Sequence, residues 1–219
     1  VLNFQYEFKE SLNSPINLSV SQIISGNNER KINVSFKQPK FLNENNEKVY
    51  SSLDIGNLYH LIMQNINLKN EIDFEYINSE INGMIQKGIL KNDDLKYISV
   101  SKIESFFKNN LGLRLMNSIK NGEIVKREFE FLMKHRINEI CESEDIRIQG
   151  IIDLFFFEGD NIILVDYKTD KMIFSDDNKF LNKYKEQLHY YKLALEKIFN
   201  KKVSESYIYS FELSKEIII

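Results

Sequence analysis

The chain has 219 residues, of which 42% are hydrophobic and 28% are charged, and its formal net charge is −3. This composition is typical of a globular domain with a sizeable core. The absence of an overall basic charge counts mildly against a DNA-binding module and less against a nuclease, whose metal site needs acidic residues and whose basic patch can be local. No apolar run is long enough to span a membrane. The single cysteine, Cys141, excludes an internal disulfide and an iron–sulfur cluster built from this chain.

Two expectations follow from cysteine usage and from the first residues. Near-absence of cysteine and the lack of a leader pattern favour a cytoplasmic location. Because the sequence opens on Val1 rather than on Met, we expect a piece of a longer protein.

The first half of the chain is predicted to be helical after a polar start. Residues 1–50 have no clear periodicity and are interpreted as a linker or packing arm. Apolar residues then recur at helical spacing from about Asp54, again over 75–87, and in two shorter segments, 101–109 and 111–119. These patterns predict four helices.

The second half switches to strands. A period-2 segment begins at Val125, and further strands are predicted over 147–158 and 161–168. A long amphipathic helix fits 179–199, and a last strand fits 204–212. The order predicts an α/β fold with a mixed sheet flanked by helices. Four residues of the first strand are expected to share one face: Val125, Phe129, Phe131 and Met133.

A two-residue loop fixes the register of the central hairpin. Gly159-Asp160 suits a type II′ turn with glycine first, so Glu158 should pair with Asn161. Counting back along both strands places Asp153 opposite Asp166. A slip of one residue would send one acid to the other face of the sheet.

Opposed carboxylates in such a hairpin need a cation, a shared proton or a basic partner. Lys168 lies two residues from Asp166 and should project from the same face. Two acids and a lysine can hold a hard divalent cation for phosphodiester hydrolysis, but they can equally form a buried Asp–Lys–Asp salt-bridge cluster. Both strands are expected to be covered on both faces, because their other residues are apolar: Ile151, Ile152, Leu154, Phe155, Phe156, Phe157, Ile162, Ile163, Leu164 and Val165.

Five segments in order resemble the RecB-like branch of the PD-(D/E)XK nuclease superfamily, over about residues 19–212. They are Gly56-Asn57-Leu58-Tyr59-His60, Arg127-Glu128-Phe129-Glu130-Phe131, Gln149-Gly150-Ile151-Ile152-Asp153, Asp166-Tyr167-Lys168-Thr169-Asp170 and Gln187-Leu188-His189-Tyr190-Tyr191. Ser19-Val20-Ser21 resembles the family's entry into its nuclease domain. Two positions depart from the family pattern, Asn57 where Thr is usual and Glu130 where Pro is usual.

The resemblance implies a role for each motif residue. His60, Asp153, Asp166 and the Tyr167 carbonyl would hold a metal ion, and Lys168 would orient the attacking water. Three further residues would support the site or touch DNA: Gln187, Tyr191 and Glu128. Without the family, His60 fits a structural histidine, Gln187 and Tyr191 fit ordinary helix positions, and Glu128 fits a solvated strand acid. His135 and His189 are interpreted as surface residues.

The resemblance also implies a fold, a reaction and partners. The expected fold is restriction-endonuclease-like, with an arm over 1–18 and a nuclease domain over 19–219, helical over about 51–120 and sheet-centred over about 121–219. The implied activity is a Mg²⁺-dependent DNA exonuclease acting on single-stranded DNA, with Mn²⁺ as a substitute and no iron–sulfur cluster. It would belong to an AddA-type helicase–nuclease with an AddB-like partner, processing double-strand breaks for recombinational repair. No Gly-x-x-x-x-Gly-Lys-Ser/Thr loop occurs in the chain. A catalytically silent DNA-binding or subunit-interaction module stays the alternative.

Overall fold

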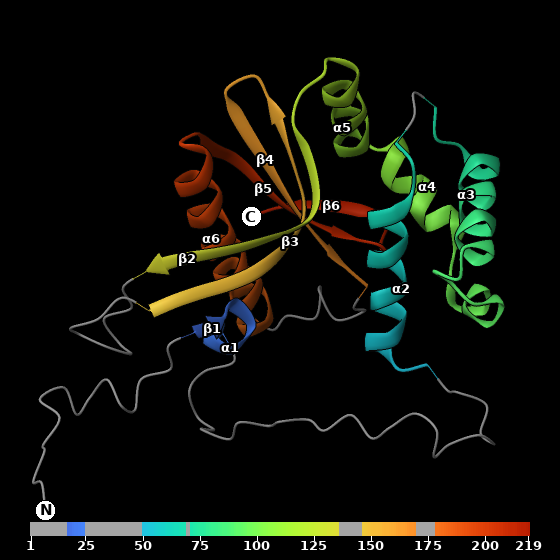
Figure 1. Ribbon diagram of the computed structural model, residues 1–219, viewed down its shortest axis with the longest axis horizontal. Coiled ribbons are helices and arrows are strands. Elements are labelled where there is room, and N and C mark those ends of the chain that lie inside the picture. Colours follow the sequence, from blue (N-terminus) through green and yellow to red (C-terminus); the bar gives the residue numbers. More distant parts are fainter. Residues whose placement is uncertain (1–16, 25–49, 69–70, 136–145, 170–177) are drawn as a thin grey trace, which may run out of the picture.

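The computed structural model describes residues 17–24, 50–68, 71–135, 146–169 and 178–219. Within these ranges a six-stranded mixed sheet lies between a single long helix and a layer of helices (Figure 1). None of the helices in these ranges is both long and apolar enough to cross a membrane. The elements run in the order β1 Asn17–Ser19, α1 Val20–Ile24, α2 Ser52–Asn65, α3 Phe74–Gln86, η2 Asn92–Tyr97, α4 Val100–Lys108, α5 Asn110–Lys120, β2 Val125–His135, β3 Ile146–Glu158, β4 Asn161–Lys168, α6 Asn178–Phe199, β5 Lys202–Ser210 and β6 Lys215–Ile218.

Strand β3 organises the sheet. Along one edge it pairs antiparallel with β2, from Val125↔Phe156 to His135↔Ile146. Along the other edge it pairs parallel with β1 near its start and antiparallel with β4 near its end. Strand β4 continues parallel to β5, and β5 pairs antiparallel with β6. The predicted mixed sheet flanked by helices is therefore confirmed.

The β3–β4 hairpin opens into a fork. The predicted register is confirmed from Glu158↔Asn161 to Leu154↔Val165, and Gly159 has the positive φ of 61° that its turn requires. Strand β1 pairs with β3 only as far as Gln149, so the intervening residues 150–153 have no strand partner on that edge among the described residues. Strand β4 meanwhile stays with β5 as far as Lys168. We call residues 150–153 of β3 and 166–168 of β4 the fork.

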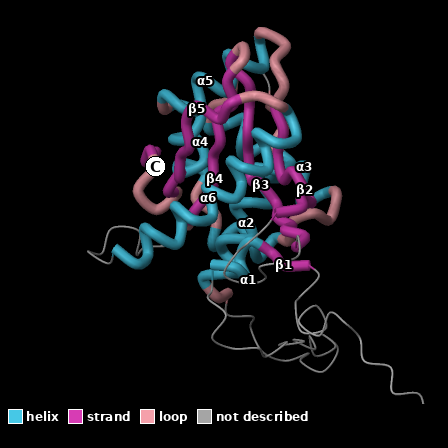
Figure 2. The backbone as a smooth tube through the Cα atoms, turned by 90° about the vertical axis from the view of Figure 1, so that its left-hand side faces the viewer, coloured by secondary structure: helices cyan, strands magenta, loops and turns pink. Residues whose placement is uncertain are grey.

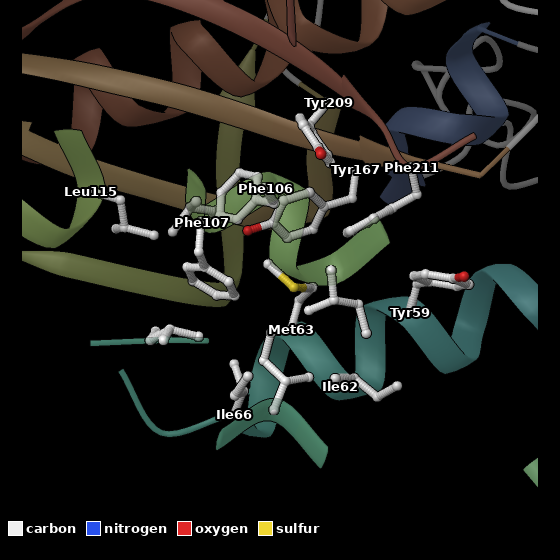
Figure 3. Packing of buried hydrophobic residues seen from close by; sticks show 14 of the residues in the cluster. Tyr59, Ile62, Met63, Ile66, Phe106, Phe107, Leu115, Tyr167, Tyr209 and Phe211 are labelled. Atoms are coloured by element: carbon white, nitrogen blue, oxygen red, sulfur yellow. The ribbon is translucent and has the colours of Figure 1, made fainter. Parts of the chain in front are cut away.

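Two hydrophobic cores cover the two faces of the sheet. Helix α6 covers one face, where its Leu188 and Leu195 pack against β3 and β4 residues. Helices α2 to α5 cover the other, and Figure 1 shows these two layers on opposite sides of the strands. Figure 2 views the molecule from the side on which α6 lies in Figure 1. Figure 3 shows how aromatic rings join the helical layer to the sheet, with Phe106 of α4 next to Tyr167 of β4 and Tyr209 of β5.

Helix α2 is fixed to the sheet at both of its ends. Its first turn begins with a capping box between Ser51 and Asp54. Gly56 faces Thr169 so closely that an added Cβ would lie 3.0 Å from the threonine Oγ1. At the other end the Arg127 guanidinium of β2 donates hydrogen bonds to the carbonyls of Met63 at 2.9 Å and Ile66 at 2.6 Å. These carbonyls have no partner within the helix, and a cation there also suits the helix dipole.

The expected face of β2 is wrong at one position. Phe129, Phe131 and Met133 pack in the α6 core as predicted, but Val125 packs on the opposite side, against the core of α2 to α5. The strand changes face at Glu128, whose φ of 47° is left-handed. A period-2 pattern assumes extended backbone throughout, so it cannot anticipate this reversal.

The expected covering of β3 needs the same correction. Ile152 packs in the α6 core together with Phe155, although alternation predicts opposite faces for them. Ile151, expected to be covered, is 46% exposed. The pairs on either side of Glu128 and Asp153 are Arg127↔Leu154 and Phe129↔Ile152, and they belong to the same register. The two strands therefore change face at the same point.

The remaining elements follow the prediction closely, with additions. Nine predicted elements lie within about two residues of their expected bounds. They are the four early helices α2 to α5, the strands β2, β3 and β4, the long helix α6 and the strand β5. The start of the chain differs, because residues 17–24 form β1 and α1, so Asn17 and Leu18 of the expected arm pair with β3. Strand β6 and the 3₁₀ helix η2 were not predicted.

Replacing Arg127 with Met is expected to lower the free energy of unfolding by about 2 kcal/mol, because two carbonyls at the end of α2 lose their donor. The melting temperature should fall by roughly 4–8 °C. Lys126→Met, at an exposed neighbouring position of β2, is the matched control and should change little. Equal melting temperatures for the two variants in calorimetry would show that Arg127 does not hold α2.

Candidate metal centre

Three potential metal ligands from three elements meet beside the fork. His60 of α2 approaches both acids, with its Nδ1 3.3 Å from Asp153 Oδ1 and 3.6 Å from Glu128 Oε1. One ligand atom from each of the three residues lies within 4.8 Å of the others. His60 and Asp153, about ninety residues apart in the sequence, therefore lie side by side, and their shared role as metal ligands stays a prediction.

An unusual backbone conformation brings Glu128 into this cluster. Left-handed φ values are uncommon for residues other than glycine, asparagine and aspartate, and they often mark functional sites. The β2–β3 pairing is recorded at Arg127↔Leu154 and at Phe129↔Ile152 but not between them. The Glu128 carboxylate therefore meets the α2 histidine, a contact that regular strand geometry would not predict.

Asp153 bridges the two sides of the fork. Its Oδ2 accepts a hydrogen bond from the backbone N–H of Tyr167 at 2.6 Å, while its Oδ1 faces His60. The recorded β3–β4 pairing stops at the preceding pair, Leu154↔Val165. The side chain of Asp153 thus takes up a backbone donor of β4 at the point where the two strands separate.

Asp166 is the most deeply buried acid of the site. It is 1% exposed, and its Oδ2 lies 2.5 Å from the Lys168 Nζ. Its Oδ1 receives no hydrogen bond from the described residues. Burial, with a smaller contribution from the charge of Asp153, raises the pKa of Asp166 to about 6 against the opposing effect of Lys168. The ion pair therefore compensates only part of the cost of burying this charge.

Helix α6 completes the surroundings of the fork. Gln187 Nε2 donates a hydrogen bond to the Tyr191 hydroxyl at 2.8 Å, as their separation by one helical turn allows. The ring of Tyr191 packs against Phe131, and an added Cβ on Gly150 would lie 2.8 Å from the Phe131 ring. Burial and the nearby charge of Asp166 raise the pKa of Tyr191, so its hydroxyl stays protonated. Glycine at position 150 lets both rings approach β3.

The charge of His60 depends on its two acidic neighbours. Burial alone would lower the pKa of the imidazole, but hydrogen bonds to Asp153 and Glu128 outweigh it and raise that pKa to about 10. His60 is therefore an imidazolium at neutral pH without a metal. Each buried acid then has a cationic partner, Asp153 with His60 and Asp166 with Lys168.

The potential ligand atoms at this site fit a divalent cation. Two carboxylates and one imidazole lie within mutual reach, and the buried Asp166 Oδ1 has no donor of its own. Carboxylate oxygens suit Mg²⁺, and the imidazole makes Mn²⁺ an equally suitable ion. A cation at His60 would replace the proton that the imidazolium carries.

Comparison with known proteins gives the family. Residues 35–216 match the PD-(D/E)XK nuclease superfamily. The chain belongs to this superfamily. It is also 36% identical to an ATP-dependent helicase/nuclease subunit of Clostridium perfringens (strain ATCC 13124) and 36% identical to the protein of the same name from Syntrophomonas wolfei, in each case over 99% of the chain. The matches cover 19% and 18% of those proteins, so the chain spans about a fifth of their length. The resemblance stated from the sequence is confirmed.

Not all predicted residues of this nuclease-superfamily site lie in one cluster. His60 and Asp153 meet with Glu128, which the sequence suggested as a supporting residue, whereas Asp166 pairs with Lys168 on the neighbouring strand. Cys141 and Asp170 lie outside the described residues. His189 is exposed, and the half-buried His135 packs its ring near Tyr190 at the far end of β2.

Two residues near the site escaped the sequence interpretation. Arg127 was recognised as part of a motif but given no role, although it holds the helix that carries His60. Tyr184 has its ring centre 5.0 Å from the Lys168 Nζ. Its spacing of three residues from Gln187 and seven from Tyr191 on one helix face is the signal that could have identified it.

Metal binding should release a proton from His60. Because the imidazolium pKa is about 10 without metal, a cation must displace its proton at neutral pH. We expect release of about one proton per Mn²⁺ bound at pH 7, and affinity that weakens by up to tenfold for each unit that pH falls. Calorimetric titration in two buffers of different ionisation enthalpy measures this. The exposed His189→Ala is the control and should behave as wild type. Proton release that persists in His60→Ala would exclude His60 as its source.

Asp166→Asn should stabilise the metal-free protein at neutral pH. The pKa of Asp166 is raised, so its contribution to stability is full below about pH 4 and is lost as pH rises through about 6. The Asn variant has no such loss, and we expect it to be more stable by on the order of 1–2 kcal/mol at pH 7.5 in EDTA. This difference should vanish near pH 4. A less stable Asn variant at pH 7.5 would mean that attraction to Lys168 outweighs burial.

Proposed function

We propose that this domain is a divalent-metal-dependent deoxyribonuclease that hydrolyses phosphodiester bonds of single-stranded DNA as an exonuclease. The observation that carries the proposal is the meeting of His60, Glu128 and Asp153 next to the Asp166–Lys168 ion pair in the fork. Family membership independently supports a nuclease, because the match covers residues 35–216. In this proposal Asp153, Asp166 and Lys168 are the catalytic residues.

The proposed metal ligands are His60, Asp153, Asp166 and the Tyr167 carbonyl, joined by Glu128 because of its contact with His60. Mg²⁺ is the proposed ion, with Mn²⁺ as a substitute. A bound divalent cation would lower the pKa of a water molecule and neutralise charge on the phosphodiester. Asp166 Oδ1, which has no donor among the described residues, is the acidic atom most in need of such a partner.

Lys168 has the position and charge to act on the reacting groups. Its ammonium group is held against Asp166 and lies over the Tyr184 ring, so it stays at the fork instead of extending into solvent. An ammonium group there would orient the attacking water and stabilise the negative charge that develops on the phosphate. The Gln187–Tyr191 hydrogen bond keeps the adjacent wall in place, and the protonated Tyr191 hydroxyl is suited to donate to a DNA phosphate.

The role of the whole protein is proposed from its relatives. Several are named as ATP-dependent helicase/nuclease subunits, and the chain spans about a fifth of their length. We expect the nuclease domain over 19–219 to follow a helicase region, to work in the cytoplasm with an AddB-like partner, and to trim unwound ends of double-strand breaks before recombination.

The decisive test is cleavage of end-labelled single-stranded DNA by the full chain. Wild type should cleave with Mg²⁺ or Mn²⁺ and not with EDTA, and Asp166→Ala or Lys168→Ala should reduce the rate by at least about a hundredfold. Asp160→Ala, an exposed acid in the hairpin turn, is the matched control and should retain activity. Melting curves establish that the variants fold.

Two outcomes would contradict the proposal. Undiminished cleavage in EDTA would exclude the metal-dependent mechanism. A folded wild-type chain that binds DNA and metal but never cleaves would support the alternative of a catalytically silent DNA-binding module.

A further inference from the structure

The end of the β2–β3 pair that lies away from the Gly159 turn carries an exposed face on the side of the sheet opposite α6. Phe131, Met133, Ile146, Ile148 and Ile152 point into the α6 core. The side chains that alternate with them are exposed, and they include two apolar residues on neighbouring strands, Leu132 at 61% and Ile151 at 46%. We call this set the open face: Glu130, Leu132, Lys134, Arg147, Gln149 and Ile151.

Strand register arranges the open face as three successive pairs. Glu130 is opposite Ile151, Leu132 is opposite Gln149, and Lys134 is opposite Arg147. The first pair lies two residues from the Glu128 and Asp153 positions on each strand. At about 3.3 Å per residue, the third pair lies roughly 20 Å from the metal cluster. The open face is thus a path that begins at the candidate centre and leads away from it.

A pocket of about 710 Å³ connects this path with the fork. Its walls include Leu132, Gln149 and Ile151 of the open face, Ser19 from β1, and Tyr191 from α6. The walls also include Gly150, which like Ile151 belongs to the part of β3 that leads to Asp153. The pocket therefore opens onto the fork.

The chemistry of the open face changes along the path. The first two pairs present apolar side chains and the Gln149 amide, which suit the flat faces and edges of nucleobases. The third pair presents two cations, Lys134 and Arg147, which suit a phosphate. Glu130 repels phosphate near the centre, so the sugar–phosphate backbone is disfavoured there except where the proposed metal neutralises it.

We propose that the open face is the track along which a single DNA strand reaches the candidate centre. Unpaired bases contact Ile151, Leu132 and Gln149, and a phosphate several nucleotides from the cleaved bond is held by Lys134 and Arg147. This track rests on the proposed nuclease function and explains its preference for single strands. Bases in a duplex are already paired and stacked, so they cannot lie on these side chains.

Binding of a fluorescein-labelled oligothymidylate to the full chain in EDTA tests the track without cleavage. Fluorescence anisotropy gives the affinity over a range of salt concentrations. The combined variant Lys134→Gln/Arg147→Gln should weaken binding by on the order of tenfold at low salt and reduce the salt slope by about 0.7, the value for one phosphate on a single strand. Leu132→Ala/Ile151→Ala should weaken binding several-fold while leaving that slope unchanged.

The matched control removes the same kinds of side chain from α5. Leu113→Ala/Lys120→Gln changes one exposed apolar residue and one exposed cation on α5, which packs near the other end of β3, where its Arg114 pairs with Glu158. The affinity of this variant should stay within twofold of wild type. A duplex competitor of the same length should displace the labelled strand more weakly than unlabelled oligothymidylate does.

The track would be refuted if both open-face variants bound as the α5 control does, if wild type failed to bind the strand, or if duplex competed equally well. These results are separate from those for cleavage. Metal-dependent cleavage with no effect of the open-face variants would leave the nuclease function and remove the track. If the open-face variants alter strand binding but no metal supports cleavage, the track would stand and the nuclease function would fall.

Discussion

The separation of β4 from β3 is the feature on which the site depends. Where the two strands part, Asp153 and Asp166 are both buried, and two cations, His60 and Lys168, lie within ion-pair distance of them. An isolated charge in such a place costs several kcal/mol, so these groups must be matched to one another or to an external ion. The surrounding cores are hydrophobic, and their low polarity strengthens the electrostatic interactions inside the fork.

The metal-free site is balanced by two different kinds of cation. His60 can lose its proton and become a ligand, because its raised pKa depends on the nearby carboxylates of Asp153 and Glu128, whose charge a metal would balance instead. Lys168 keeps a compact charge on a flexible stem and cannot become a magnesium ligand in its protonated form. One cation can therefore give way to a metal while the other remains for a reacting phosphate.

The sequence contains enough information for the hairpin but not for the reversal beside it. Gly159-Asp160 determines the β3–β4 register because a two-residue turn leaves one pairing, and the structure has that pairing as far as Leu154↔Val165. The left-handed Glu128 breaks the alternation that predicts Val125 on the same face as Phe129 and Ile151 in the core. The residue type at position 128 gives no sign of this conformation. The family resemblance identified His60, whose distance in sequence from Asp153 exceeds any local pattern. The contribution of Glu128 depends on a backbone angle that only the folded chain reveals.

His60 belongs to the helical layer, whereas the acids that it meets belong to the sheet. A cation shared between them would join the two layers through residues about ninety positions apart in the sequence. Such a link would form only in the folded chain, because unfolding separates the ligands, so it would stabilise the fold. An opening in which α2 leaves the sheet would then also have to release the metal. Loading with metal would thus make the helical layer and the sheet unfold more cooperatively.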